Sequence, residues 1–155
     1  MRDMQDDIVP DVRKSCLEQK MGGPFGAVVY KDGRIVGKGV NRVVGNNDPT
    51  AHAEIEAIRD ACANLHTFDL SGCELYATGY PCPMCMAAII WANIKLVHYS
   101  CDYDDASRIG FRDAPIATFI GGGCRDANVL RLEPVSKDKV LELYRAFHEG
   151  QGQLY

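Results

Sequence analysis

Two short motifs in this chain together supply four side chains that suit a metal site. The first contains His52 and, two residues later, Glu54; the second contains Cys82 and Cys85 in the order Pro-Cys-Pro-Met-Cys. One imidazole and two thiolates are three zinc ligands, and a catalytic zinc site keeps its fourth position for water or substrate. We therefore predict one zinc ion per chain, held by His52, Cys82 and Cys85, with a bound water or hydroxide.

Glu54 is the predicted catalytic residue. Zinc lowers the pKa of a bound water from roughly 16 towards about 7, and a base must then collect the proton and pass it to a leaving group. Glu54 follows the ligand His52 closely enough to do this without binding the metal. Other interpretations are a redox pair or half of a structural zinc site for the cysteines, and a capping or packing role for His52. The order of the two motifs, each at an expected helix start, favours the catalytic interpretation.

Composition narrows the class of protein. A chain of 155 residues is most simply one domain, here 1–155. Its formal net charge of −4 argues against a large nucleic-acid surface, and it has no apolar run long enough to span a bilayer. The polar, acidic residues 1–7 do not resemble a signal peptide. Seven cysteines without a disulfide spacing indicate a reducing, cytoplasmic setting.

Hydrophobic periodicity and turn residues predict alternating helices and strands. Asp32-Gly33 is typical of a tight hairpin turn, and Pro10 suggests a kink or a later start in the first helix. We expect helices at 4–20, 50–63, 83–92 and 137–148, strands at 26–30, 34–40, 74–78, 94–100 and 129–132, a polar loop at 41–49, and irregular structure at 111–123.

This pattern predicts an α/β fold with three layers, α/β/α, in which helices cover both faces of a five-stranded mixed sheet. Both metal motifs would then lie at helix N-termini on one edge of the sheet, where open α/β sheets bind ligands. Asn41, at the exit of the second strand, could contact a ligand or stabilise a turn. The acidic residues within 102–110 could face solvent or meet donor nitrogens of a substrate.

The chain resembles the cytidine deaminase superfamily and, more narrowly, its small bacterial zinc-dependent guanine deaminases. The resemblance covers nearly the whole chain and is carried by Gly22–Val28, Asn47–Glu54, Pro81–Cys85 and Ala88–Ala92. Its metal motifs are specific for the superfamily but not for the substrate. One departure is Tyr80, where the family usually has glutamate before Pro-Cys, so the pocket shape or the substrate range could differ.

The resemblance implies a single cytidine deaminase-like domain that hydrolyses guanine to xanthine and ammonia. Asn41, the Ala53 backbone and Asp105 would hold the edges of the base, and Phe25 and Trp91 would pack against it or belong to the core.

The resemblance also implies a homodimer. The C-terminal helix and tail, 134–155, would be exchanged between subunits, and the last residue, Tyr155, would close the partner's pocket. A small purine is the expected partner, without a membrane and without nucleic acid.

Other functions remain open at this point. A tRNA adenosine deaminase carries nearly the same motifs but would need a basic surface. Guanosine, cytosine or a related amino-heterocycle could also be the substrate. A non-catalytic zinc or redox module is a further alternative, and the presence of Glu54 argues against it.

Overall fold

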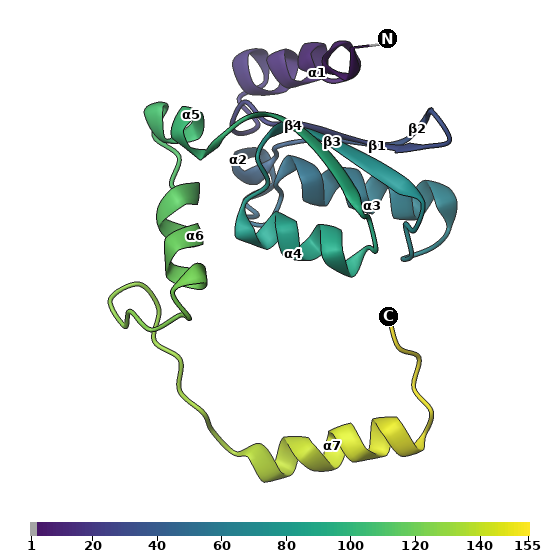
Figure 1. Ribbon diagram of the computed structural model, residues 1–155, viewed down its shortest axis with the longest axis vertical. Helices are drawn as coiled ribbons and strands as arrows, with labels where there is room; N and C mark the ends of the chain where they lie inside the picture. The colour runs from purple at the N-terminus through teal and green to yellow at the C-terminus, as the bar shows by residue number, and fades with distance from the viewer. Residues whose placement is uncertain (1–2) are drawn as a thin grey trace. The chain divides into compact units, whose positions relative to one another are not determined.

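The structure, a computed structural model, describes residues 3–155 and has two compact units, Met1–Ala117 and Thr118–Tyr155. The first unit contains the whole sheet and both metal motifs, and the second contains helix α7 (Lys137–Glu149) (Figure 1). The single domain over 1–155 and the exchange of 134–155 stay predictions. No helix in the described part of the chain is long and apolar enough to cross a membrane.

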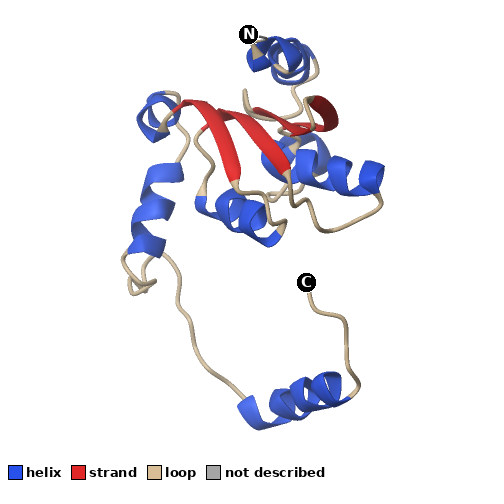
Figure 2. Ribbon diagram, turned by 45° about the vertical axis from the view of Figure 1, so that its right-hand side comes forward, coloured by secondary structure: helices blue, strands red, loops and turns tan. Residues whose placement is uncertain are grey.

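The sheet has four strands in the order β2-β1-β3-β4 (Figure 2). β1 is antiparallel to both of its neighbours, whereas β3 and β4 are parallel, so the sheet is mixed as predicted. The strands are β1 (Gly26–Lys31), β2 (Arg34–Val40), β3 (Cys73–Gly79) and β4 (Leu96–Cys101). Asp32 and Gly33 have φ angles of 50° and 74°, the left-handed conformation that the predicted hairpin turn requires.

The predicted fifth strand at 129–132 is wrong. Within residues 3–155 this segment forms no strand; instead the N–H groups of Val129 and Leu130 donate to the Asp126 carbonyl at 3.0 and 3.2 Å. The Asp126 side chain also accepts from the Asn128 N–H at 2.9 Å. These local hydrogen bonds satisfy the backbone in a turn, and so short an apolar run does not by itself specify a strand.

The segment 111–123, predicted to be irregular, contains helix α6 (Asp113–Gly121). Its sequence, Asp-Ala-Pro-Ile-Ala-Thr-Phe-Ile-Gly, places an acidic residue and a proline in the first turn, which are ordinary helix-start signals. The irregular structure predicted for 111–123 is therefore wrong for this part of the segment, and the glycines at 121–123 mark the end of the helix.

Helices cover both faces of the sheet, as predicted. The N-terminal segment, predicted as one helix, is a 3-10 turn (Met4–Asp7), α1 (Val9–Arg13) and a π-helical turn (Lys14–Glu18). Pro10 stands in the first turn of α1, where its missing N–H leaves no helical bond unmade. The apolar residues of this segment pack with one face of the sheet through Ile8, Val12, Val28, Tyr30, Val40 and Tyr76.

Helices α3 (Ala53–Leu65) and α4 (Pro83–Trp91) cover the other face (Figure 1). α3 buries a stripe of small residues, Ala53, Ala57 and Ala61, whereas its larger apolar residues Ile55 and Ile58 are only half-buried. The glycines of β2 permit this close packing. A Cβ atom on Gly39 would lie 2.3 Å from the Ala53 carbonyl oxygen, so the start of α3 is set directly against the strand.

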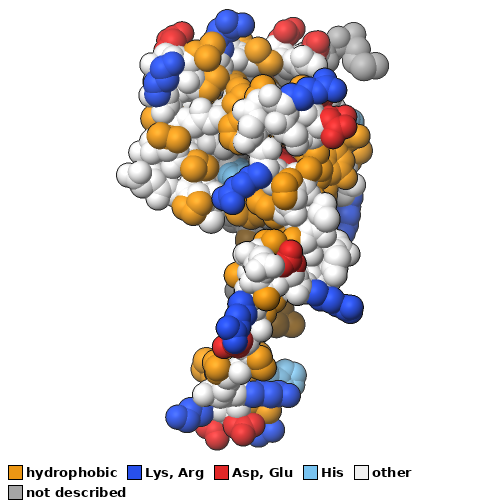
Figure 3. Space-filling model, turned by 90° about the vertical axis from the view of Figure 1, so that its left-hand side faces the viewer, with side chains coloured by type: hydrophobic (Ala, Val, Ile, Leu, Met, Phe, Trp, Pro, Cys, Tyr) orange, Lys and Arg blue, Asp and Glu red, His pale blue; other side chains and the backbone are white. Residues whose placement is uncertain are grey.

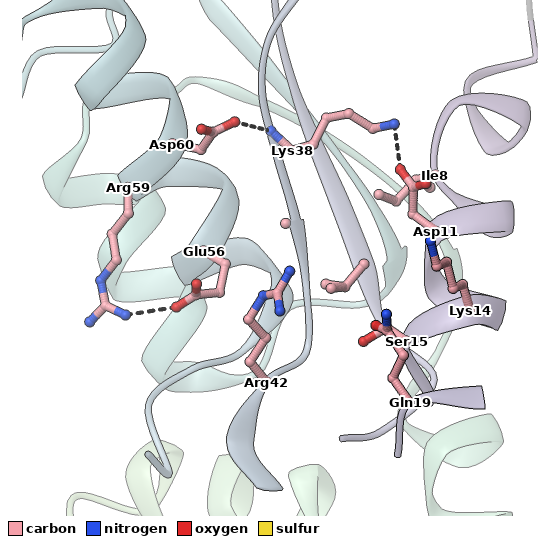
Figure 4. Close-up of a pocket in the computed structure, with 12 residues that line it drawn as sticks. Ile8, Asp11, Lys14, Ser15, Gln19, Lys38, Arg42, Glu56, Arg59 and Asp60 are labelled. Atoms are coloured by element: carbon pink, nitrogen blue, oxygen red, sulfur yellow. Dashed lines mark hydrogen bonds and ion pairs between the residues drawn. The ribbon is translucent and has the colours of Figure 1, made fainter. Parts of the chain in front are cut away.

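Polar side chains tie the outer edge of β2 to the helices beside it (Figure 4). The backbone N–H of Lys38 donates to Asp60 of α3 at 2.9 Å, and Asn64 of α3 donates to the Val36 carbonyl at 2.9 Å. The Lys38 ammonium forms an ion pair with Asp11 of α1 at 2.5 Å. β2 and α3 are thereby held in register, which fixes the exit of the strand relative to the start of the helix.

Candidate active site

The predicted metal ligands come together at the N-termini of two helices. His52 is the N-cap of α3, Cys82 is the N-cap of α4, and Cys85 lies in the first turn of α4. Their ligand atoms all lie within 4.8 Å of one another, and no other such group of three exists among residues 3–155. Both caps have extended backbone angles, which turn the side chains away from the helix axes and towards each other.

The distances within this group suit zinc. His52 Nδ1 lies 3.5 Å from Cys82 Sγ and 3.6 Å from Cys85 Sγ. Zinc bonds of about 2.0–2.1 Å to nitrogen and about 2.3 Å to sulfur, at a tetrahedral angle, put such atoms roughly 3.6 Å apart. The three residues therefore fit a zinc ion with one coordination position left over.

Charge within the group also favours a cation. Hydrogen bonding from the Cys85 thiol lowers the pKa of Cys82 to about 4, so one thiolate forms readily. Hydrogen bonding to Cys82 raises the pKa of His52. A second thiolate beside the first needs a positive charge, which a bound metal ion supplies.

Glu54 lies in the first turn of α3 and is only 8% exposed. Burial raises the pKa of its carboxyl to about 7. A group with that pKa can both take up and release a proton near neutral pH. Glu54 also hydrogen-bonds the Cys85 side chain, so it sits against the metal group without being one of its three ligands.

A cavity of about 720 Å³ opens beside this group. Its lining includes His52, Cys82 and Glu54, together with the predicted substrate contacts Phe25, Asn41 and Asp105. The Phe25 ring packs edge-to-face on Phe111, with 4.8 Å between ring centroids. A cavity of this size accommodates a small ligand such as a purine.

Asn41 is buried, with an exposed fraction of 5%. Its side-chain oxygen accepts hydrogen bonds from the backbone N–H groups of Gly23 at 3.3 Å and Val43 at 3.2 Å. The amide NH2 group has no acceptor among residues 3–155. The oxygen therefore stabilises a turn, which is one of the two interpretations from the sequence, and contact of the amide nitrogen with a ligand stays a prediction.

Asp105 lines the cavity, but its carboxylate already has protein partners. It accepts from the Asp102 N–H at 3.1 Å, and the Asp102 side chain accepts from the Asp105 N–H at 3.0 Å. This reciprocal pair is the capping box of α5 (Tyr103–Arg108). Arg108 lies 3.8 Å from the same carboxylate.

A second carboxyl group, that of Asp113 at the start of α6, was not among the site residues predicted from the sequence. Asp113 lines the cavity and interacts electrostatically with His52, Cys82 and Tyr103. Burial raises its pKa. An acidic residue in the first turn of a helix is a common sequence pattern. Only its approach to the metal motifs therefore distinguishes Asp113 as a functional candidate.

The other three predicted substrate contacts, Ala53, Trp91 and Tyr155, are not among the residues that line the cavity. Ala53 is fully buried, and its N–H, at the first position of α3, has no intrahelical acceptor. Trp91 is 64% exposed at the end of α4 and is not part of the cavity lining. Tyr155 is 80% exposed at the end of the second unit.

Tyr80, which stands where the resemblance implies glutamate, packs against two other tyrosines. Tyr80 lines the cavity, and its ring packs edge-to-face on Tyr99 and Tyr103, with centroids 4.8 and 5.0 Å away. The Tyr103 hydroxyl donates to the Pro81 carbonyl at 2.8 Å. Burial raises the pKa of Tyr103 to about 12, so its hydroxyl keeps its proton.

Comparison with known proteins agrees with a zinc site at His52, Cys82 and Cys85. Residues 7–101 match the family described as the cytidine and deoxycytidylate deaminase zinc-binding region. A guanine deaminase of Bacillus subtilis (strain 168) is 52% identical over 94 residues, which are 61% of this chain and 60% of that protein. A tRNA-specific adenosine deaminase of Aquifex aeolicus is 48% identical over 77 residues, which are 50% of this chain and 51% of that protein.

Among solved structures, the X-ray structure of guanine deaminase from Bacillus subtilis superposes with a TM-score of 0.85 and 35% identity. That alignment covers 100% of this chain and 99% of the other. The sequence matches are shorter: the chain spans 60% and 51% of the two curated relatives named above.

Proposed function

Since the chain belongs to the family of the cytidine and deoxycytidylate deaminase zinc-binding region, we propose that it hydrolyses a free purine base, guanine, to xanthine and ammonia. The observation that carries the proposal is the group of His52, Cys82 and Cys85 beside a cavity that also contains the buried acid Glu54. Three ligands, an acid with a pKa of about 7 and a purine-sized cavity together suit hydrolytic deamination.

His52, Cys82 and Cys85 would hold the zinc ion. When bound there, zinc activates a water molecule at its remaining coordination position. Glu54 takes a proton from the attacking water and delivers it to the amino nitrogen that leaves as ammonia. Its burial keeps the carboxyl close to equal populations of its two protonation states near pH 7.

The substrate is oriented by groups that the protein leaves available. The Asn41 NH2 group donates to an acceptor of the base, and the Ala53 N–H does the same from the start of α3. Phe25 packs on the face of the ring. Asp113 is a second carboxyl group able to accept from donor nitrogens or to move a proton, and its position near His52 and Cys82 favours it over Asp105 for that role.

The assembly is also a proposal. Two chains would form a homodimer that exchanges the segment 134–155, and Tyr155 would close the pocket of the partner subunit. The free cysteines of the described chain are compatible with the reducing cytoplasm, which we propose as the location.

Deamination of adenosine in tRNA is the second candidate function, and the likeness to the Aquifex aeolicus enzyme supports it. The net charge of −4 opposes it, because tRNA binding depends on clustered Lys and Arg. On the face shown in Figure 3, Lys and Arg side chains are scattered among hydrophobic and neutral atoms, and several lie beside Asp or Glu side chains.

One experiment tests these proposals together. The purified protein is analysed for zinc and assayed for ammonia release from guanine, guanosine, cytosine and adenine, and from a tRNA substrate at moderate salt. We expect one zinc per chain, activity on guanine, loss of activity with a chelator and recovery with added zinc. Deletion of the last residues should lower activity on guanine. Release of ammonia from tRNA alone would overturn the proposed substrate.

A further inference from the structure

The loop that carries Cys82 is attached to the end of β4 and the start of α5 at two successive residues. The Tyr80 N–H donates to the Cys101 carbonyl at 2.7 Å, and the Pro81 carbonyl accepts from the Tyr103 hydroxyl at 2.8 Å. Pro81 is fully buried, so its carbonyl depends on a protein partner. The structure therefore fixes the peptide group immediately before a metal ligand.

The geometry of that peptide group links Tyr103 to the cavity. No cis peptide bond occurs in the described chain, so the Pro81–Cys82 peptide is trans. The Pro81 carbonyl and the Cys82 N–H therefore lie in one plane and point in opposite directions. Tyr103, on the carbonyl side, is not part of the cavity lining, whereas Cys82 is. The Cys82 N–H has no acceptor among residues 3–155. It is thus a donor available on the side away from Tyr103.

We propose that Tyr103 is a positioning residue whose hydroxyl orients the Pro81–Cys82 peptide so that the Cys82 N–H donates to oxygen developing on the substrate carbon. This inference rests on the proposed function. A donor fixed in advance stabilises developing charge without reorganisation, and a hydrogen bond accepted by the carbonyl strengthens the N–H of the same peptide.

The rings beside Tyr103 restrict its movement. Tyr80 packs edge-to-face on Tyr103 and on Tyr99, with ring planes at 83° and 86°. Tyr80 is also the residue at which the chain departs from the pattern that its resemblance implies, where glutamate is usual. A ring held on one side and bonded at its hydroxyl has little rotational freedom, which suits a positioning role.

The test compares Tyr103→Phe with the matched control Tyr99→Phe. Both remove one hydroxyl from the same aromatic group, but the Tyr99 hydroxyl has no hydrogen bond among residues 3–155 and Tyr99 does not line the cavity. Removing one oxyanion donor costs roughly 10²–10³ in kcat, and tilting it should cost less, so we expect about a tenfold loss in Tyr103→Phe. KM for guanine should stay within about twofold, since the interaction forms in the transition state.

Two NMR measurements on the zinc-loaded protein need no substrate. The amide proton shift of Cys82 should move in Tyr103→Phe and not in Tyr99→Phe. In the unmodified protein, the Tyr103 hydroxyl proton should exchange with solvent much more slowly than the Tyr99 hydroxyl proton. Because it uses the unmodified protein, this second measurement tests the hydrogen bond of the Tyr103 hydroxyl even if Tyr103→Phe does not fold.

The outcomes separate the two proposals. An unshifted Cys82 amide, an unchanged kcat, or a Tyr103 hydroxyl proton that exchanges as fast as that of Tyr99 would overturn the positioning role. Loss of zinc together with kcat would also overturn it, because the hydroxyl would then support the metal site as a whole. A wild-type protein that releases no ammonia from guanine would refute the proposed function, while both NMR measurements would still decide how the peptide is held.

Discussion

Replacing Glu54 by glutamine should abolish activity and, at the same time, stabilise the metal-free protein at alkaline pH. Glutamine has nearly the same shape but cannot take up or deliver the proton. A positioned acid–base group contributes roughly 10²–10⁴ in rate, so we expect a loss of at least that order in kcat. The gain in stability follows from the burial of Glu54, which is 8% exposed.

The magnitude comes from the shifted pKa. Burial raises the pKa of Glu54 from 4.5 to about 7, which at about 1.36 kcal/mol per pKa unit corresponds to roughly 3 kcal/mol against the ionised form. Below pH 4.5 the carboxyl is protonated in both the folded and the unfolded chain, so the variant has no advantage. Between pH 4.5 and about 7 only the unfolded chain ionises, and the wild type loses stability relative to Glu54→Gln.

The assay is urea unfolding of metal-free wild type and Glu54→Gln at pH 4 and pH 8.5, followed by circular dichroism. The difference in unfolding free energy should be near zero at pH 4 and rise to about 3 kcal/mol at pH 8.5. Zinc adds a positive charge near the carboxyl, so the difference should shrink in the loaded protein. The exposed Glu74, 48% exposed at its side chain, provides the control Glu74→Gln.

A difference between wild type and Glu54→Gln that does not change with pH would refute the argument from burial. The same gain in Glu74→Gln would show a general charge effect. Retention of activity in Glu54→Gln would remove Glu54 from the proton transfer and, with it, the proposed mechanism.

Three further predictions concern neighbouring groups. Asp113→Asn should lower kcat about 100-fold if the carboxyl moves a proton. Asp105→Asn should mainly lower the melting temperature, because Asp105 belongs to the capping box of α5. The reverse pattern would favour Asp105 as the substrate contact, as predicted from the sequence. Asn41→Asp keeps the oxygen that Gly23 and Val43 use but removes the NH2 donor, so KM for guanine should rise about fivefold to tenfold, and an unchanged KM would exclude the contact. Gly39→Ala should cost about 1–3 kcal/mol and lower zinc content, because its Cβ would lie 2.3 Å from the Ala53 carbonyl. Gly121→Ala, whose Cβ would meet nothing within 4 Å, is its control.

The sequence was sufficient to predict the hairpin turn and the three metal ligands. Asp32-Gly33 predicted the hairpin because only a few residue types accept the left-handed turn, and the structure confirms it. His52, Cys82 and Cys85 were predicted to converge from their spacing at two helix starts, and their atoms lie within 4.8 Å. The hairpin depends only on neighbouring residues. The meeting of His52 with Cys82 and Cys85, which are 30 and 33 residues away, also required both helices to start at one edge of the sheet, and the alternation of strands and helices predicted that arrangement.

The sequence by itself determined which residues could hold the metal and which acid could stand beside them, since those roles follow from side-chain chemistry and short spacing. Only the tertiary structure decided that four strands form the sheet, that Asp113 approaches the metal motifs while Asp105 caps a helix, and that Trp91 lies outside the cavity. Those outcomes depend on where α4 packs before the last strand and where α5 and α6 lie after it. Hydrophobic periodicity predicts the elements but not the path of the chain between them.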